Sequence, residues 1–312
     1  MFCIVSFIVL SILGIFSASN RALAKEALSC VGRRVTFRPC DTGFDEKIKA
    51  RILGKTINRS EKLARFINKY FELLAWLFFM LMLAASILFL RGLYLFYTTG
   101  SCNGLNQSGF CAFDPTGKNN QVSSPGVCVA PSVDGKSSMT LDAVDLSQFP
   151  VWNAQGKERI VMVGCYTCEY THHTYPMLKK LAQKYNAAFY FLGWPVHSDS
   201  EFVNNVAYVA YQTDKEKYWK LNDLLFAADF KTISDPANLR KALLDAGFEP
   251  DLILNAASSF ATSAATKPLV EQILTTKTPG TPTVFIKDEV LIGPKPYRVY
   301  AIALKGLLYW LK

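Results

Sequence analysis

The strongest constraint on the fold of this chain is the apolar segment LLAWLFFMLMLAASILFLRGLYLFY, which runs from Leu73 to Tyr97. A helix needs about 20 apolar residues to cross the hydrocarbon of a bilayer, and this segment meets that length. Its one charged residue, Arg91, falls near one end, where a long side chain can bring its charge to the interface. The sequence therefore predicts a transmembrane helix over residues 73–97.

A second apolar segment, MFCIVSFIVLSILGIFSA, covers residues 1–18 and is marginal in length for a membrane span. Two interpretations compete: an uncleaved transmembrane helix, or a secretory signal peptide cleaved near the small residues Ala22 and Ala24. Signal peptides carry positive charge ahead of the apolar run, and no Lys or Arg precedes this one. We therefore interpret residues 1–18 as the first of two transmembrane helices, with Cys3 as one of its apolar residues.

Most of the net charge of +9 falls between the two apolar segments, in residues 19–72. A basic loop flanked by apolar spans fits the positive-inside rule better than a nucleic-acid-binding pattern. We therefore expect a cytoplasmic loop with the lipid bilayer and no nucleic acid as its partner. The N-terminus and everything after Tyr97 would then be extracytoplasmic, and the localisation would be the cell membrane. The basic residues are Arg21, Lys25, Arg33, Arg34, Arg38, Lys47, Lys49, Arg51, Lys55, Arg59, Lys62, Arg65 and Lys69.

The basic loop has a predicted helix and two cysteines. Apolar residues at helical spacing predict either an amphipathic helix that lies on an anionic membrane surface or a plain solvated helix. These residues are Ile48, Ile52, Leu53 and Ile57. Cys30 and Cys40 are expected to be reduced structural thiols, because the cytosol keeps thiols reduced, with metal binding or redox sensing as the alternatives.

Residues 98–145 are rich in Gly, Ser, Asn and Pro, which is typical of loops, and we expect an extracytoplasmic linker there. Cys102 and Cys111 are expected to form a structural disulfide in this oxidising space. An alternative role for the pair is a relay that carries electrons to or from a second dithiol. Cys128 has no evident partner in the sequence, and it either pairs with a linker cysteine or stays free.

An α/β domain is predicted for residues 146–312. The buried strand ERIVMVG is followed by the helix CEYTHHTYPMLKKLAQKY and by a second strand, AAFYFLGWPV. Several helical stretches come next. The segment GTPTVFIKDEVLIG then indicates two strands joined by a turn, ahead of a last helix. The predicted order is therefore β-α-β, a helical block, and β-β-α.

A C-x-x-C motif, formed by Cys165 and Cys168, follows the first strand of this domain and opens its first helix. Free backbone N–H groups and the helix dipole at such a position stabilise a thiolate, which is the form that attacks a disulfide. Cys168, one turn further on, is placed to resolve the mixed disulfide that results. The alternative is a metal site of Cys165, Cys168 and His172, although no second pair of ligands follows at zinc-finger spacing.

The C-x-x-C between strand and helix, together with Thr281-Pro282 ahead of the two-stranded hairpin, resembles the thioredoxin fold. The helical block in between is similar to the DsbA-like branch of that superfamily. The fold class expected for the chain is therefore α/β, a thioredoxin fold with a DsbA-like helical insertion, preceded by two transmembrane helices. The resemblance covers residues 146–312. It implies a cis peptide bond at Thr281–Pro282 packed against the dithiol, and a groove where an extended substrate segment adds as a strand.

The resemblance also implies a membrane-tethered thiol–disulfide oxidoreductase that acts on proteins with free cysteines or disulfides. Cys165 and Cys168 would be the redox-active pair, and Thr281 and Pro282 would shape the groove. The dipeptide Tyr166-Thr167 differs from the Pro-His of the best-known oxidising members. Because this dipeptide helps to set thiolate stability, a disulfide reductase or isomerase is an alternative to the expected dithiol oxidase.

Two further alternatives stay open on sequence grounds. One is a thioredoxin-like metal-binding chaperone. The other is a scaffold whose dithiol is vestigial and whose basic loop holds a cytoplasmic partner. For the enzyme, no cofactor is expected, and a quinone-linked membrane protein is the family expectation for the partner that recycles the dithiol.

Overall fold

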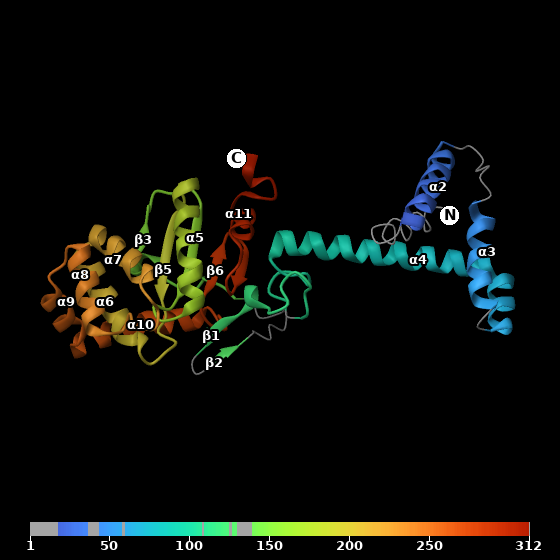
Figure 1. Ribbon diagram of the computed structural model, residues 1–312. Helices are drawn as coiled ribbons and strands as arrows, with labels where there is room; N and C mark the ends of the chain where they lie inside the picture. Colours follow the sequence, from blue (N-terminus) through green and yellow to red (C-terminus); the bar gives the residue numbers. More distant parts are fainter. Residues whose placement is uncertain are drawn as a thin grey trace. The chain divides into compact units, whose positions relative to one another are not determined.

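The computed structural model describes residues 18–36, 44–57, 60–107, 109–124, 127–129 and 139–311 (Figure 1). The chain divides into two compact units, Met1–Leu90 and Arg91–Lys312. The first expected transmembrane helix, residues 1–18, lies outside the described residues except for Ala18, which begins helix α2.

The described part of the N-terminal unit is helical. α4 is the long helix that contains the predicted membrane span. Its one residue with non-helical backbone angles, Tyr70 (φ −109°, ψ 19°), marks a kink between the basic start of the helix and its apolar remainder. Within the described residues one candidate span is found, Trp76–Thr99, with a mean hydropathy of 2.0 and none of it buried. The helices are α2 (Ala18–Val35), α3 (Phe44–Ile57) and α4 (Glu61–Thr99).

Cys30 departs from the sequence expectation. Its side chain is buried on α2 and is disulfide-bonded, so the expectation of a reduced thiol at this position is wrong. The expectation came from the assigned compartment, and a compartment carries no information about which sulfurs lie close enough to bond. Cys40 lies outside the described residues.

The C-terminal unit contains a five-stranded sheet with the strand order β3-β5-β4-β6-β7. The central strand β4 runs parallel to β5 and antiparallel to β6, and both edge strands are antiparallel to their neighbours. The strands are β3 (Val151–Trp152), β4 (Arg159–Gly164), β5 (Ala188–Gly193), β6 (Thr283–Ile286) and β7 (Glu289–Ile292). The strands β4 and β5 come from the predicted β-α-β segment, and β6 and β7 come from the predicted β-β-α segment. The mixed sheet is consistent with a DsbA-like thioredoxin fold.

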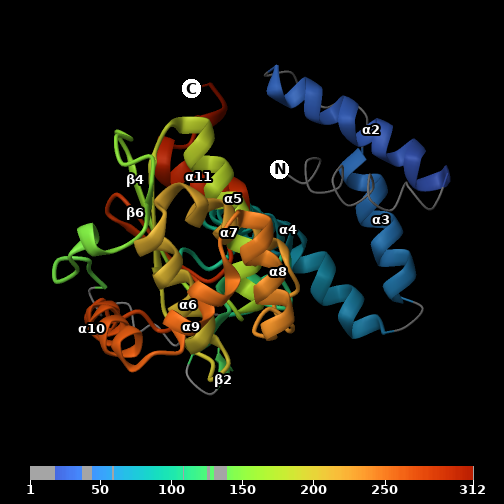
Figure 2. The same cartoon turned by 90° about the vertical axis from the view of Figure 1, so that its left-hand side faces the viewer.

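Both faces of the sheet are covered, as the strand β4 shows. Ile160 and Met162 belong to one core, together with residues of α5, α7 and α11, whereas Val161 and Val163 belong to a second core with residues of α10. Because successive side chains of a strand alternate between faces, a central strand covered on both sides must be apolar throughout. Helices α6 to α10 form a block inserted between β5 and β6 (Figure 2). The helices are α5 (Glu169–Tyr185), α6 (Ser200–Thr213), α7 (Lys215–Ala227), α8 (Pro236–Ala246), α9 (Pro250–Ala257), α10 (Phe260–Thr275) and α11 (Tyr297–Lys305).

The segment after α4, predicted to be a linker, packs on the edge of this sheet. Cys102 and Cys111 form a disulfide there, with 5.3 Å between their Cα atoms. The Asn106 side chain accepts a hydrogen bond from Ile292 N (2.8 Å) and donates one to Val290 O (2.6 Å), so it covers the outer edge of β7. The segment ends its described part in a short antiparallel pair, β1 (Val122–Ser124) and β2 (Val127–Val129).

Lys295, between β7 and α11, forms hydrogen bonds with the same segment. Its side chain is buried, and its amine donates hydrogen bonds to Asn119 O at 2.7 Å and to Asn120 Oδ1. Burial lowers the pKa of Lys295 to about 7, because a charged amine is poorly solvated there. A neutral amine has two N–H donors, which match the two acceptors.

The last turn of α4 is tied to α11. Arg298 Nε donates to Tyr97 O (3.1 Å), its Nη2 donates to Phe96 O (3.2 Å), and the guanidinium lies 4.9 Å from the centre of the Phe96 ring. A cation at the C-terminal end of a helix compensates the carbonyl groups that lack a partner there. Gly100, with a φ of 80°, then turns the chain out of the helix. The last turn of α4 is therefore part of the packing of the C-terminal unit.

The buried amine predicts a pH dependence of stability. The pKa of Lys295 is about 7 in the folded chain and has its ordinary value of 10.5 in the unfolded chain. Between these values the unfolded state binds more protons, so the free energy of unfolding should rise with pH, by up to about 1.4 kcal/mol per pH unit. Chemical unfolding measured at pH 7.5 and 9.5 tests this. The variant Lys295→Met should lose that part of the slope, and an unchanged slope would contradict the assignment.

Candidate active site

The two cysteines of the C-x-x-C motif occupy a turn between β4 and α5. β4 ends at Gly164, Cys168 N donates to Cys165 O at 3.3 Å, and α5 begins at Glu169 with Cys168 as its N-cap. The sequence pattern predicts that Cys165 opens the helix, whereas the structure gives that place to Cys168. Tyr166 and Thr167 form the turn that separates Cys165 from the helix. Both cysteines carry free thiols, and each is only 1% exposed.

The segment Thr281–Pro282 meets this turn, and its peptide bond is cis, as the family resemblance implies. The register of the sheet explains the meeting, because Val163 near the end of β4 lies opposite Thr283 at the start of β6. The residues that follow β4 and those that precede β6 must therefore emerge side by side. The thiol of Cys168 donates to Thr281 O at 3.5 Å. The structure thus brings all four predicted site residues together.

A strand of the linker segment occupies the groove at the same place. Ser123 N donates to Thr281 O, and Thr281 N donates to Ser123 O, both at 2.8 Å, in an antiparallel bridge. The Ser123 hydroxyl also accepts a hydrogen bond from the thiol of Cys168 at 3.1 Å. Nothing in the sequence indicates this role of Ser123, because a serine in a loop-like segment carries no signal of a contact with a residue far along the chain.

Thr167 connects Cys165 to a carboxylate that the sequence analysis also missed. Its hydroxyl donates to Asp199 Oδ1 at 3.2 Å and lies 3.6 Å from the sulfur of Cys165. An ionised carboxylate only accepts hydrogen bonds, so the single proton of the hydroxyl points to Asp199. The oxygen can then accept from a Cys165 thiol but has no proton to offer to a Cys165 thiolate. Asp199 is the residue that precedes α6 and is its N-cap.

A polar groove of about 760 Å³ opens beside the turn. It is formed by the start of α5, the loop after β5, the segment after α7, and β1. Its polar lining includes Ser123, Thr167, Glu169, His197, Asp199 and Lys231.

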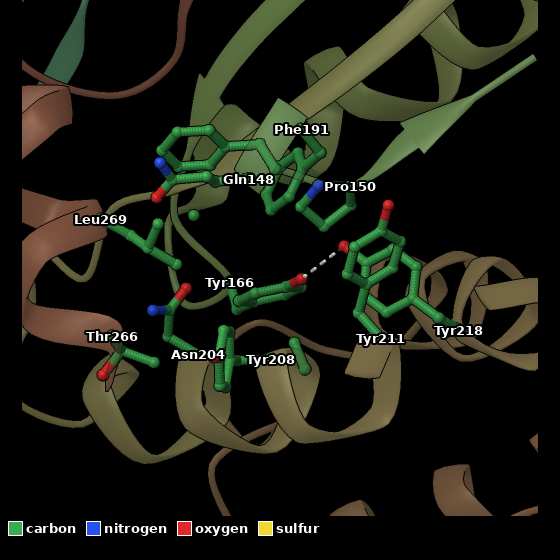
Figure 3. A pocket seen from close by; sticks show the side chains of 13 residues that line it. Gln148, Pro150, Tyr166, Phe191, Asn204, Tyr208, Tyr211, Tyr218, Thr266 and Leu269 are labelled. Atoms are coloured by element: carbon green, nitrogen blue, oxygen red, sulfur yellow. Dashed lines mark hydrogen bonds between the residues drawn. The ribbon is translucent and has the colours of Figure 1, made fainter. Parts of the chain in front are cut away.

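Tyr166 points away from this groove into the domain. Its hydroxyl donates to Asn222 Oδ1 at 2.8 Å and lies 3.3 Å from the hydroxyl of Tyr218 on the same helix, α7 (Figure 3). Its ring stacks on Phe226, with 5.2 Å between the ring centres. Burial raises the pKa of Tyr166 above its usual range, so the hydroxyl stays protonated and able to donate. The rings of Tyr166 and Tyr218 also border a small cavity of about 40 Å³.

His172 forms a hydrogen bond with the backbone of the turn that contains the two cysteines. Its Nε2 lies 2.5 Å from Tyr166 O, and burial lowers the pKa of His172 below its usual value, so a neutral ring donates this bond. Among the described residues, no group of three His, Cys, Asp or Glu side chains converges on a point where a metal ion could bind. The geometry therefore gives no support to the alternative metal site of His172 with the two cysteines.

The hydroxyl of Tyr166 predicts a measurable effect on stability. The change Tyr166→Phe removes the donor nearest to the buried Asn222 Oδ1 and should lower the free energy of unfolding by about 1 kcal/mol. Tyr211→Phe, which removes a hydroxyl from the border of the same cavity but not from the dithiol turn, is the matched control. Denaturant unfolding of both variants makes the comparison. Equal losses in the two variants would contradict a particular role for Tyr166.

Comparisons with known proteins agree with this geometry. The family described as "DSBA-like thioredoxin domain" matches residues 150–305, half of the chain. Among solved structures, the catalytic domain of Proteus mirabilis ScsC is 20% identical, with a TM-score of 0.45 over 56% of this chain and 94% of that one. Oxidised BdbD from Bacillus subtilis is 16% identical, with a TM-score of 0.46 over 53% and 95%.

The thiol-disulfide exchange protein alpha-DsbA2 from Wolbachia pipientis is 16% identical, with a TM-score of 0.44 over 51% of this chain and 87% of that one. No curated protein matches the chain significantly. The C-x-x-C turn against the Thr281–Pro282 loop and the family match over residues 150–305 agree on one conclusion. The chain belongs to the family of DSBA-like thioredoxin domains, and its enzyme class is that of the thiol–disulfide oxidoreductases.

Proposed function

We propose that the chain is a membrane-tethered dithiol oxidase that forms disulfides in exported proteins. The observation that carries the proposal is the contact between the dithiol and Thr281. Cys168 donates to Thr281 O, and the same residue pairs through its backbone with an extended strand. An extended client segment that pairs there would bring its own sulfur to the dithiol.

The reaction then runs through Cys165 and Cys168 in two exchanges. A client thiolate attacks Cys165 of the Cys165–Cys168 disulfide, a client–Cys165 disulfide forms, and Cys168 leaves as a thiolate. A second client thiolate attacks the client sulfur of that bond and releases Cys165. Two electrons pass from the client to the dithiol, and the two released thiolates take up protons. A quinone-linked membrane partner would accept these electrons and restore the disulfide.

Reduction or isomerisation of client disulfides is a second candidate, and one observation favours it. The Thr167 proton is directed to Asp199, so the Cys165 thiolate receives no hydrogen bond from the residue that follows Tyr166. A thiolate with less stabilisation makes the dithiol a weaker oxidant. Asp199 is therefore the group on which the direction of electron flow depends.

We propose that the dithiol domain lies outside the cytoplasm. The apolar stretch of α4, Trp76–Thr99, would be the membrane span next to it, and residues 1–18 would be the first of two spans. The basic charge of residues 19–72 supports a cytoplasmic loop between them. The disulfide Cys102–Cys111, in the same unit as the dithiol, supports an oxidising surrounding.

The proposed function predicts which proteins a resolving-cysteine variant captures. In Cys168→Ala, Cys165 can still attack a client disulfide, which is the second exchange in reverse. Without Cys168 the product cannot pass back through the first exchange, so mixed disulfides should accumulate. Alkylated whole-cell extracts, separated without reduction and analysed by mass spectrometry, should contain exported proteins linked to this chain. The double variant Cys165→Ala/Cys168→Ala should capture none. Capture of cytosolic proteins alone would contradict the proposed location, and equal labelling in both variants would contradict the exchange reaction.

The link from Asp199 to Cys165 predicts a shift in redox properties. In Asp199→Ala the hydroxyl of Thr167 loses its acceptor and can donate to the Cys165 thiolate. A hydrogen bond to a charged group is worth about 1.5 kcal/mol, so the pH midpoint of Cys165 alkylation should fall by about one unit. The reduction potential, measured against glutathione, should rise with it.

A variant that lacks the Thr167 hydroxyl distinguishes an effect of Asp199 through this hydroxyl from a direct effect of the Asp199 charge on the Cys165 thiolate. In Thr167→Val the further change Asp199→Ala should shift the midpoint by much less. The same full shift in both backgrounds would mean that Asp199 acts on Cys165 through space alone.

A further inference from the structure

The groove beside Thr281, proposed above to bind clients, is occupied by a strand of the chain itself, β1. β1 makes both backbone hydrogen bonds that Thr281 can offer to an added strand, each at 2.8 Å. The neighbouring strands of the sheet cannot accept a client in its place, because β6 is already paired on both sides, with β4 and with β7. A client strand and β1 therefore compete for the same two backbone groups.

The bound strand also contacts the dithiol at Cys168. Cys165 and Cys168 are each 1% exposed, and Ser123, which accepts the hydrogen bond from Cys168, is 2% exposed. A disulfide exchange needs the incoming sulfur in line with the sulfur that it attacks. While this strand is in place, Ser123 lies against the Cys168 sulfur on the side where a client strand would pair with Thr281.

Specific contacts hold β1 where it is. Tyr170 donates through its hydroxyl to Gln121 Oε1 at 2.5 Å, and Val122 is buried. Gly293, with a φ of 78°, lets the backbone of the linker come very close, since a Cβ there would lie 2.7 Å from Gln121 O. These contacts reach β1 from both α5 and the end of β7, which argues for a built site and against an incidental contact.

One feature of the bound state favours exchange of β1 for another strand. The hydroxyl of Thr281 is buried and, among the described residues, has no hydrogen-bond partner. An unpaired buried hydroxyl is destabilising, so an incoming strand that satisfies it gains an advantage over β1.

We propose that β1 is a tethered substrate mimic, and that clients enter as extended segments by displacing it. This inference rests on the proposed function and adds the class of segment that the groove takes. The client residue that pairs with Thr281 should be small, because Ser123 fills that position with almost no exposed surface. The hairpin itself holds a cysteine in register with that position, since Cys128 on β2 is the cross-strand partner of Ser123.

A disulfide-trapping experiment on the full chain in detergent tests whether β1 is docked in solution. Ser123→Cys, in a chain whose Cys165 and Cys128 are replaced by Ser, should oxidise to an intramolecular disulfide with Cys168, because the serine oxygen is 3.1 Å from that sulfur. Peptide mapping by mass spectrometry identifies the bond. Thr116→Cys, at an exposed linker position in the same background, is the control and should not form it. Equal cross-linking of both variants, or none with Ser123→Cys, would overturn the proposal.

A second measurement tests whether β1 limits access. Ser123→Pro removes the N–H that donates to Thr281 O, so the dithiol of the otherwise native chain should be alkylated about tenfold faster, as expected for the loss of one buried hydrogen bond. Thr116→Pro is the matched control and should leave the rate unchanged. An unchanged rate in Ser123→Pro would overturn the proposal.

Different results would overturn the proposed function and the proposal that β1 is a substrate mimic. Faster alkylation without any exchange of a peptide–glutathione mixed disulfide would overturn the proposed function and leave the docked strand standing. Rapid peptide exchange by the unaltered chain, with no gain in Ser123→Pro, would overturn the substrate mimic and leave the enzyme standing.

Discussion

The antiparallel pairing of β4 with β6 is the constraint on which the whole site depends. With Val163 opposite Thr283, the chain that leaves β4 and the chain that enters β6 must lie next to each other. Cys165 and Cys168 follow the first strand, and the cis-proline loop precedes the second. A shift of one residue in this register would turn every side chain of β6 to the opposite face, and both cores would be lost. The geometry of the dithiol is therefore protected by the packing of the entire sheet.

The residues between the two cysteines connect the dithiol to the inserted helices in two directions. Tyr166 reaches inward and bonds to α7, whereas Thr167 faces the groove and bonds to Asp199 ahead of α6. His172 holds the carbonyl group of Tyr166 between them. Through Asp199 the start of the insertion thus directs the Thr167 proton away from Cys165, and through α7 it holds Tyr166 in place.

Sequence patterns were informative where local chemistry dominates. The continuous apolar run of β4 predicted a buried central strand, and the C-x-x-C with the distant Thr281-Pro282 predicted the fold of the C-terminal unit. The roles of Ser123 and Asp199 could not be predicted in this way, because each depends on a contact across a large sequence separation between residues of common type. The composition of residues 98–145 indicated a loop, yet two of its asparagines bind β7 and Lys295.

The disulfides constrain the membrane arrangement that the apolar helix suggests. Cys30 and the pair Cys102–Cys111 lie on opposite sides of Trp76–Thr99 in the sequence. If this helix crosses a bilayer once, it separates the two disulfides, and only one of them faces an oxidising compartment. The dithiol belongs to the same compact unit as Cys102–Cys111, so these four cysteines share one side. If the helix spans a bilayer, the clients proposed for the dithiol would lie on the side on which Cys102–Cys111 persists in the cell.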